Sequence, residues 1–432
     1  MTCEVAVLNQ YAAVIAADSA VTYTNGATEE VRYSKGGNKI FQLSHHQPVG
    51  IMIYDSGSLL GVPWEIIIKE YRKDLGTASF DTIEEYADHF VSFISNNRLF
   101  FPDAERDANY VSVIGRAMMM LLSHAVYQNS ILRDANASSA DRAAAWAAYF
   151  SAVEARCNAL PYLNGFDDAQ LDARRQLALS GSLVNDATTA VAALATDGQA
   201  YVSDFVDIDD WLRITILQSA KEFGSYLQVS GLVFAGYGKS QFFPQLAERK
   251  VSTFTGQSVV WSSGNTLTVT RDQPSHISQF ATTSMVDVFT KGYGFGMFLA
   301  VDDAIDATFS GIPAAISAAA GTALPHDAPA IFQAAREAFH QAWTQRLHQE
   351  NFAKIQGTIG TLPIDEMVHL AETMIVLESL KEKVTSPSQS VGGPVDIAVI
   401  AREEGLVWVK RKQFFDSAKN PRFMLRQQQI YR

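Results

Sequence analysis

The fold is decided by the first eighteen residues, which are MTCEVAVLNQYAAVIAAD. Two short apolar runs, Val5 to Leu8 and Ala12 to Ala17, are separated by Asn9-Gln10, a pair with turn chemistry. Asp18-Ser19 ends the second run. The segment therefore predicts two short strands joined by a tight turn at the very start of the chain.

Strand character continues beyond this segment. Thr24-Asn25-Gly26 is a strong turn signal. Further strands are expected over residues 31–33, 39–43 and 49–54, followed by a helix from Pro63 to Asp74, whose Trp64, Ile67, Ile68 and Tyr71 have helical spacing. Four or more strands are thus packed into the first 55 residues. We place the first half of a core domain at residues 1–80.

The pattern then changes to helices. Apolar residues at helical spacing and alanine-rich stretches predict an all-helical insertion over residues 81–225. Strands return between residues 226 and 270, and helices return from about Met285, with a Gly/Pro-broken loop expected between Gly311 and Pro325. Helices are also predicted over 329–349 and 364–383, and strands over 395–400 and 406–410, before a basic and aromatic tail.

This order predicts an α+β fold with an antiparallel sheet, in which strands from both chain ends lie side by side. We place the second half of the core domain, with extra helices and a basic C-terminal tail, at residues 226–432.

Composition excludes some partners. The formal charge of −12 over 432 residues argues against nucleic acid or an anionic membrane as the main partner. Only two cysteines, Cys3 and Cys157, are present, so a reducing compartment is expected. The start has no basic region and carries Glu4, which is atypical of a signal peptide. No stretch has the roughly 20 apolar residues of a membrane span. We expect a cytoplasmic protein that binds neither membrane nor nucleic acid.

Three residues near the start form a possible catalytic set: Thr2, Asp18 and Lys39. An N-terminal threonine attacks a carbonyl with its hydroxyl and uses its own α-amine as base, since that amine has a pKa near 8. A nearby ammonium lowers the pKa of both groups, and a carboxylate holds the lysine in place. Met1 is removable because the next residue is small. The set predicts Thr2 as the nucleophile.

These residues resemble the start of a proteasome β subunit. The spacing from Thr2 to Asp18, the Ala16-Ala17 pair before it and the strand Lys39-Ile40-Phe41 all match, although the segment from Asp18 to Lys39 is several residues longer. A second resemblance is Ser390-Val-Gly-Gly-Pro394 with the strand after it, which is similar to the bacterial proteasome relatives called Anbu. Phe234 to Gly238 is also similar to the mid-domain strand of the family.

The resemblance to proteasome, HslV and Anbu peptidases implies a four-layer αββα sandwich and hydrolysis of peptide bonds by a threonine-type endopeptidase. It implies Thr2 as nucleophile, Lys39 as the group that tunes its pKa, Asp18 as the anchor of Lys39, and Ser390 as a hydrogen-bond partner of the amine. No cofactor and no metal are implied. The implied partners are a peptide or unfolded protein, further copies in a ring or helical homo-oligomer, and an ATP-dependent unfoldase or adaptor.

The chain departs from the family at several points. Pro387 stands where the family has an aspartate three positions before the serine, and Thr282-Thr283-Ser284 only loosely matches the family's Gly-Ser-Gly. The oxyanion-hole amide is expected between Ile53 and Gly57, where Asp55 is an unusual neighbour for a developing negative charge.

Other interpretations stay open at this stage. The same fold could serve as an inactive scaffold or binding subunit, or hydrolyse a non-peptide amide. Cys3 as nucleophile would require removal of both Met1 and Thr2. The spacing of Glu366, His369 and Glu372 resembles a metal site but lacks further ligands. Gly236 to Ser240 lacks the spacing of a phosphate-binding loop. The helical insertion could shield the site, contact other subunits or bind an adaptor.

Overall fold

The computed structural model describes residues 2–24, 31–224, 227–322, 325, 328–385, 391–413 and 415–430. Antiparallel strands and many helices make up the chain, which confirms the α+β class. Met1, Pro387 and Ser390 lie outside the described residues, so the predictions made for them stay predictions.

The first sheet joins the two ends of the chain. Its strand order is β12 (Ser275–Ala281), β1 (Cys3–Asn9), β2 (Ala13–Ala17), β13 (Asp396–Ala401) and β14 (Gly405–Lys410), all antiparallel. The side-chain oxygen of Asn9 accepts from the backbone N–H of Tyr11 at 2.9 Å, which forms the turn expected between β1 and β2. The pairing of β2 with β13 confirms that strands from both chain ends lie side by side.

The second sheet is built from the middle of the chain. Its order is β11 (Ser258–Thr268), β10 (Gln245–Thr255), β9 (Ser230–Gly236), β6 (Val49–Asp55) and β5 (Ile40–Gln42). Two short hairpins flank the sheets, β3 (Val21–Thr24) with β4 (Val31–Ser34) and β7 (Ser58–Leu59) with β8 (Val62–Pro63).

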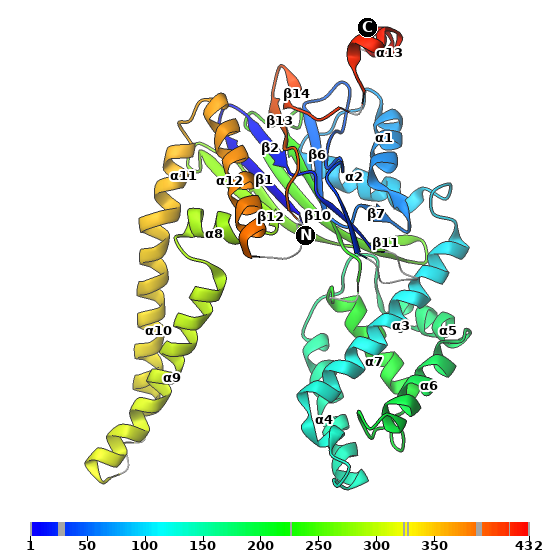
Figure 1. Ribbon diagram of the computed structural model, residues 1–432, viewed down its shortest axis with the longest axis vertical. Helices are drawn as coiled ribbons and strands as arrows, with labels where there is room; N and C mark the ends of the chain where they lie inside the picture. The colour runs from blue at the N-terminus through cyan, green and yellow to red at the C-terminus, as the bar shows by residue number, and fades with distance from the viewer. Residues whose placement is uncertain are drawn as a thin grey trace.

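The two sheets pack face to face, with helices on both outer faces (Figure 1). Ile15 of β2, Met52 of β6 and Ile400 of β13 belong to one buried apolar cluster between the sheets. Gly50 permits this close approach, because a Cβ there would lie 2.9 Å from Cδ1 of Ile400. Helices α8 (Ser284–Lys291), α11 (Ala353–Ile359) and α12 (Ile364–Thr385) cover the first sheet, and α1 (Trp64–Leu75) and α2 (Ile83–Asn96) cover the second.

Successive side chains of β1 point to opposite faces of the first sheet and therefore lie in two different environments. Cys3, Val5 and Val7 pack against the helices that cover the first sheet, whereas Ala6 and Leu8 lie between the sheets. Glu4 has the same parity as Ala6. Its side chain therefore belongs to the face between the two sheets.

One helical arm follows α2. Helices α3 to α7, with the short η1, form a cluster with its own apolar core. Because α2 packs on the second sheet, this cluster begins at α3 rather than at residue 81. The helices are α3 (Asp103–Gln128), η1 (Ser130–Arg133), α4 (Ser139–Asn158), α5 (Asp168–Leu179), α6 (Leu183–Thr196) and α7 (Ile208–Lys221).

Helix α3 has a composition that a membrane span also has. Among the described residues it is the one helix long and apolar enough to cross a bilayer, and α5 with α6 would make a second only as a pair bent by 71°. Buried residues of α3, including Ile114 and Met118, pack within the core of the helical arm.

A second helical arm extends from α8. Helices α9 (Phe295–Ala320) and α10 (Ala328–Leu347) form it, and a π-helical turn, η2 (His348–Phe352), leads back to α11. The loop predicted between Gly311 and Pro325 is wrong from Gly311 to Ala320, since α9 continues through Pro313 to Ala320. The many alanines around Pro313 have the highest helix propensity and sustain the helix. The chain ends in η3 (Ser417–Lys419) and α13 (Pro421–Ile430).

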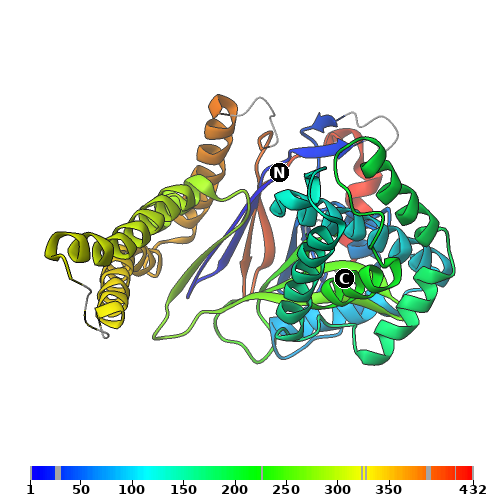
Figure 2. The same ribbon diagram turned by 90° about the horizontal axis from the view of Figure 1, so that it is seen from below.

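Both arms project from the same end of the sheets. Figures 1 and 2 place the start of β1 at this end, between the arm of α9 and α10 and the arm of α3 to α7.

Candidate active site

Three strand ends meet at the start of β1. Thr2 directly precedes β1, Asp18 directly follows β2, and Lys39 directly precedes β5. The backbone N–H of Thr282, just after β12, donates to the carbonyl oxygen of Thr2 at 2.8 Å and fixes the first residue of the site. All three predicted side chains are buried, with exposed fractions of 7% for Thr2, 1% for Asp18 and 5% for Lys39.

Asp18 is held by backbone donors and by Lys39. Its Oδ1 accepts from the Lys39 ammonium and, at 3.3 Å, from the backbone N–H of Cys3. Its Oδ2 accepts from the N–H of Gly392 at 2.6 Å and from that of Ala20 at 3.4 Å. The carboxylate thus ties β1, β2 and the segment before β13 to the lysine.

A fourth polar residue, Glu4, completes the cluster, and sequence reasoning missed it. The Thr2 hydroxyl donates to Oε2 of Glu4 at 3.1 Å, and Oε1 of Glu4 lies 3.1 Å from Nζ of Lys39. Glu4 is fully buried. The sequence signal for Glu4 was a carboxylate within a largely apolar strand, two positions after Thr2. Residues i and i+2 of an extended chain share a face, so this spacing places Glu4 beside Thr2.

Burial and charge set the protonation of the cluster. Burial raises the pKa of Glu4 from about 4.5 to about 7, even though the Lys39 ammonium acts in the opposite direction. Burial alone would lower the pKa of Lys39, but the charges of Glu4 and Asp18 outweigh it and raise that pKa. Lys39 therefore stays an ammonium at neutral pH, whereas Glu4 gains or loses its proton near pH 7.

Cys3 faces away from this cluster. Its side chain packs among apolar residues beneath the covering helices, and burial raises the pKa of its thiol well above the ordinary value. A buried thiol with a raised pKa is a poor nucleophile. The geometry disfavours Cys3 in that role.

The segment before β13 contacts the site through the backbone of Gly392. Gly392 donates to Asp18 and its carbonyl accepts from the N–H of Ser19 at 3.2 Å. Gly392 and Gly393 both have positive φ, of 139° and 88°, which side chains other than glycine rarely adopt. These two glycines therefore shape the site through the backbone.

The strand end predicted to hold the oxyanion hole has an unusual backbone. Asp55, the last residue of β6, has a φ of 62°, a conformation that costs free energy for a residue with a side chain and is concentrated at functional sites. The amide of Ile53 donates to Lys39 at 2.8 Å and that of Ser56 to Val229 at 3.2 Å. Within the described ranges Gly57 has no such backbone partner for its N–H.

A cavity of about 500 Å³ opens beside these strand ends. It is lined by the ends of β6 and β12 and by facing residues of β10 and β11, including Asp55, Lys250, Gln279 and Thr282. Thr282 is also the residue that holds the Thr2 carbonyl. The cavity therefore adjoins the start of β1.

The Thr282-Thr283-Ser284 segment leads into α8. The Ser284 hydroxyl donates to Oε1 of Glu378 at 2.6 Å, and the N–H of Met285 donates to Oε2 at 2.7 Å. Lys381 in turn donates to the Ser284 hydroxyl. A buried carboxylate of α12 thus fixes the start of α8.

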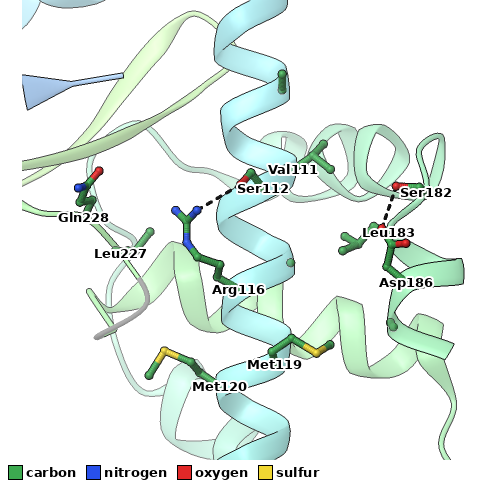
Figure 3. Close-up of a pocket in the computed structure, with 13 residues that line it drawn as sticks. Val111, Ser112, Arg116, Met119, Met120, Ser182, Leu183, Asp186, Leu227 and Gln228 are labelled. Atoms are coloured by element: carbon green, nitrogen blue, oxygen red, sulfur yellow. Dashed lines mark hydrogen bonds between the residues drawn. The ribbon is translucent and has the colours of Figure 1, made fainter. Parts of the chain in front are cut away.

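A larger cavity lies elsewhere, in the helical arm. It measures about 910 Å³ and is lined by α3, α6 and residues 227–228 (Figure 3). Figure 3 shows Arg116 turned back to Ser112 and Ser182 bonded to Asp186, among apolar side chains such as Met119 and Leu183. None of Thr2, Glu4, Asp18 or Lys39 lines it.

Across the described part of the chain, no group of three or more His, Cys, Asp or Glu residues is placed to hold a metal ion. Glu372, from the Glu366-His369-Glu372 pattern, instead pairs with Lys410 at 2.6 Å.

Two Anbu structures are among the solved structures to which this chain is similar. An Anbu Gly-1 mutant from Hyphomicrobium sp. strain MC1 aligns with a TM-score of 0.27 and 9% identity, covering 100% of this chain and 96% of that one. The helical assembly of the Anbu complex from Pseudomonas aeruginosa aligns with a TM-score of 0.26 and 10% identity, covering 99% and 95%. No family model and no curated protein matches the chain.

Proposed function

We propose that this protein is a proteasome-like threonine peptidase in which the hydroxyl of Thr2 attacks the peptide carbonyl. The supporting observation is the convergence of Thr2, Asp18 and Lys39 at three strand ends, in a buried, hydrogen-bonded cluster. On this proposal the two facing sheets and their covering helices form the four-layer αββα sandwich of N-terminal-nucleophile hydrolases.

Each residue has a role in the proposal. Removal of Met1 frees the α-amine of Thr2, which acts as base. Lys39 supplies a fixed positive charge that favours the alkoxide of Thr2, because Asp18 and Glu4 keep its pKa raised. Asp18 holds the lysine. Ser390 is proposed as a further partner of the amine. The Gly57 amide is the proposed oxyanion donor, and the cavity at the end of β6 receives part of the substrate.

The reaction proceeds in two halves. The oxygen of Thr2 bonds to the carbonyl carbon and gives a tetrahedral intermediate, which expels the amine of the leaving peptide after protonation. Water then attacks the resulting ester, releasing the carboxylic acid and restoring Thr2.

Other parts of the proposal concern partners and location. We propose a peptide or unfolded protein as substrate, assembly of several copies into a ring or helix, delivery of substrate by an ATP-dependent unfoldase or adaptor, and a cytoplasmic location. Two free, buried cysteines fit a reducing compartment. Exposed apolar residues on the α9–α10 arm support assembly, since α9 has no buried residue.

The test is covalent labelling of Thr2. Intact mass first establishes whether Met1 is removed; a protein that keeps Met1 would instead be the inactive scaffold. A peptidyl epoxyketone, which bonds to both the hydroxyl and the amine, should then add one equivalent to the wild type and none to Thr2→Ala. Thr2→Ala should lose at least a hundredfold in peptide cleavage. Wild-type cleavage by Thr2→Ala would refute the proposal, and labelling without peptide cleavage would indicate a different amide as substrate.

A further inference from the structure

We infer that Glu4 is a catalytic residue whose carboxylate accepts the proton of the Thr2 hydroxyl as that oxygen attacks the carbonyl. The inference rests on the proposed function and adds a second proton acceptor to it, beside the α-amine. It concerns a residue of this chain that the family resemblance does not supply.

The geometry places an acceptor directly on the reacting oxygen. The Thr2 hydroxyl donates to Oε2 of Glu4 at 3.1 Å, within the reach required of a general base. Thr2 directly precedes β1 and Glu4 is the second residue of that strand, so the two side chains, two positions apart, lie on the same side of the chain. The carboxylate cannot turn towards water, because Glu4 is fully buried between the sheets.

Charge neutralisation does not explain why Glu4 is there. Lys39 already pairs with Asp18, whose oxygens also accept from three backbone N–H groups. A second buried carboxylate on the same lysine is costly unless it is protonated or used. Apart from its 3.1 Å approach to Lys39, Oε1 has no hydrogen-bond partner among the described residues. Glu4 is thus a buried acid that Lys39 does not need as a partner, and its Oε2 accepts a hydrogen bond from the hydroxyl of Thr2.

The surroundings give Glu4 the proton affinity that this role needs. The titratable groups that act on it or feel its charge are Lys39 before β5, Asp18 after β2, Tyr54 on β6 and Cys3 on its own strand. Burial raises its pKa to about 7. A general base is most effective when its pKa lies near the working pH.

The proton balance of the step is complete. The Thr2 oxygen forms a bond to the carbonyl carbon, the carbonyl electron pair moves to oxygen, and the hydroxyl proton moves to Oε2 of Glu4. The neutral Glu4 acid then returns that proton to the leaving nitrogen as the carbon–nitrogen bond breaks. In the second half Glu4 accepts a proton from water and returns it to the Thr2 oxygen.

The experiment measures acylation of Thr2 by a peptidyl β-lactone, followed by intact mass from pH 5 to pH 9, in the wild type and in Glu4→Gln. Glutamine keeps the size of the side chain and an acceptor oxygen but cannot take the proton. We expect the wild-type rate to fall below about pH 7. We expect Glu4→Gln to be at least a hundredfold slower at pH 8, the lower end of the effect of a general base.

Controls separate this role from a structural one. Asp88→Asn also removes a carboxylate from a buried cation, Arg249, but on the outer face of the second sheet, and should keep the wild-type rate. Thermal melting monitors folding of each variant. Glu4→Gln within threefold of wild type, with the same pH profile, would overturn the role of Glu4 and leave the peptidase proposal intact. Absence of labelling in the wild type with a free Thr2 amine, or labelling of Thr2→Ala, would overturn both.

Discussion

Oε1 of Glu4 lies 3.1 Å from Nζ of Lys39, while the same ammonium also donates to Oδ1 of Asp18. One buried lysine is therefore shared by two buried carboxylates. The shared cation couples the residue that touches the Thr2 hydroxyl to the residue that anchors the loop at Gly392. This coupling makes the stability of the fold and the chemistry of the site depend on the same three side chains.

Replacement of Lys39 by methionine should destabilise the fold by about 3–5 kcal/mol, because it leaves two buried carboxylates without their cation. The measurement is the free energy of unfolding in urea at pH 8. In a Glu4→Gln background the same replacement should cost less, with a coupling of about 1–3 kcal/mol. Additive effects of the two substitutions would mean that Glu4 and Lys39 do not interact.

The free energy of unfolding should depend on pH because Glu4 titrates at a higher pH in the folded state than in the unfolded state. Its pKa rises from about 4.5 to about 7 on folding, so the folded state binds its proton more tightly than the unfolded state does. The stability that this proton provides is present below about pH 4.5 and is lost as pH rises through 7, by up to about 3 kcal/mol. Unfolding in urea at pH 5 and pH 8 measures it. Glu4→Gln should lose less stability than the wild type over this interval, and equal losses would contradict the assignment.

The sequence predicted much of the fold because its signals are local. Two short apolar runs and the turn at Asn9-Gln10 correctly indicated β1 and β2, which pair as antiparallel strands. The loop predicted after Gly311 is wrong up to Ala320 because the helix propensity of the alanines outweighs the effect of Gly311 and Pro313 and continues α9.

Glu4 was missed for a different physical reason. In the sequence Glu4 is an isolated charge within an apolar run. Its buried carboxylate pairs with Lys39, which directly precedes β5 of the second sheet. Packing of α2 on the second sheet is likewise a tertiary contact that helical periodicity does not encode.

Two substitutions of Gly57 should show whether its backbone N–H binds the oxyanion. A Cβ at this position meets nothing within 4 Å, so Gly57→Ala should keep both stability and activity. Gly57→Pro removes the N–H proposed to bind the oxyanion and should lower kcat by about 10²–10³. Steady-state cleavage of a peptide substrate checks this, with thermal melting to confirm folding. Equal activity of the two variants would place the oxyanion donor elsewhere.

The α9–α10 arm should mediate assembly of copies of this chain. Phe295 and Met297 at its base are 68% and 67% exposed, and the described part of α9 has no buried residue, which is unusual for a helix so rich in apolar side chains. Burial of these side chains against a second copy would remove that apolar area from water. The double variant Phe295→Gln, Met297→Gln should therefore shift the sedimentation mass from oligomer towards monomer at micromolar concentration. Leu99→Gln is the matched control, since Leu99 is 85% exposed but lies between α2 and α3, away from this arm, and it should leave the mass unchanged. A monomeric wild type, or an oligomer that withstands the double substitution, would exclude this arm as the interface.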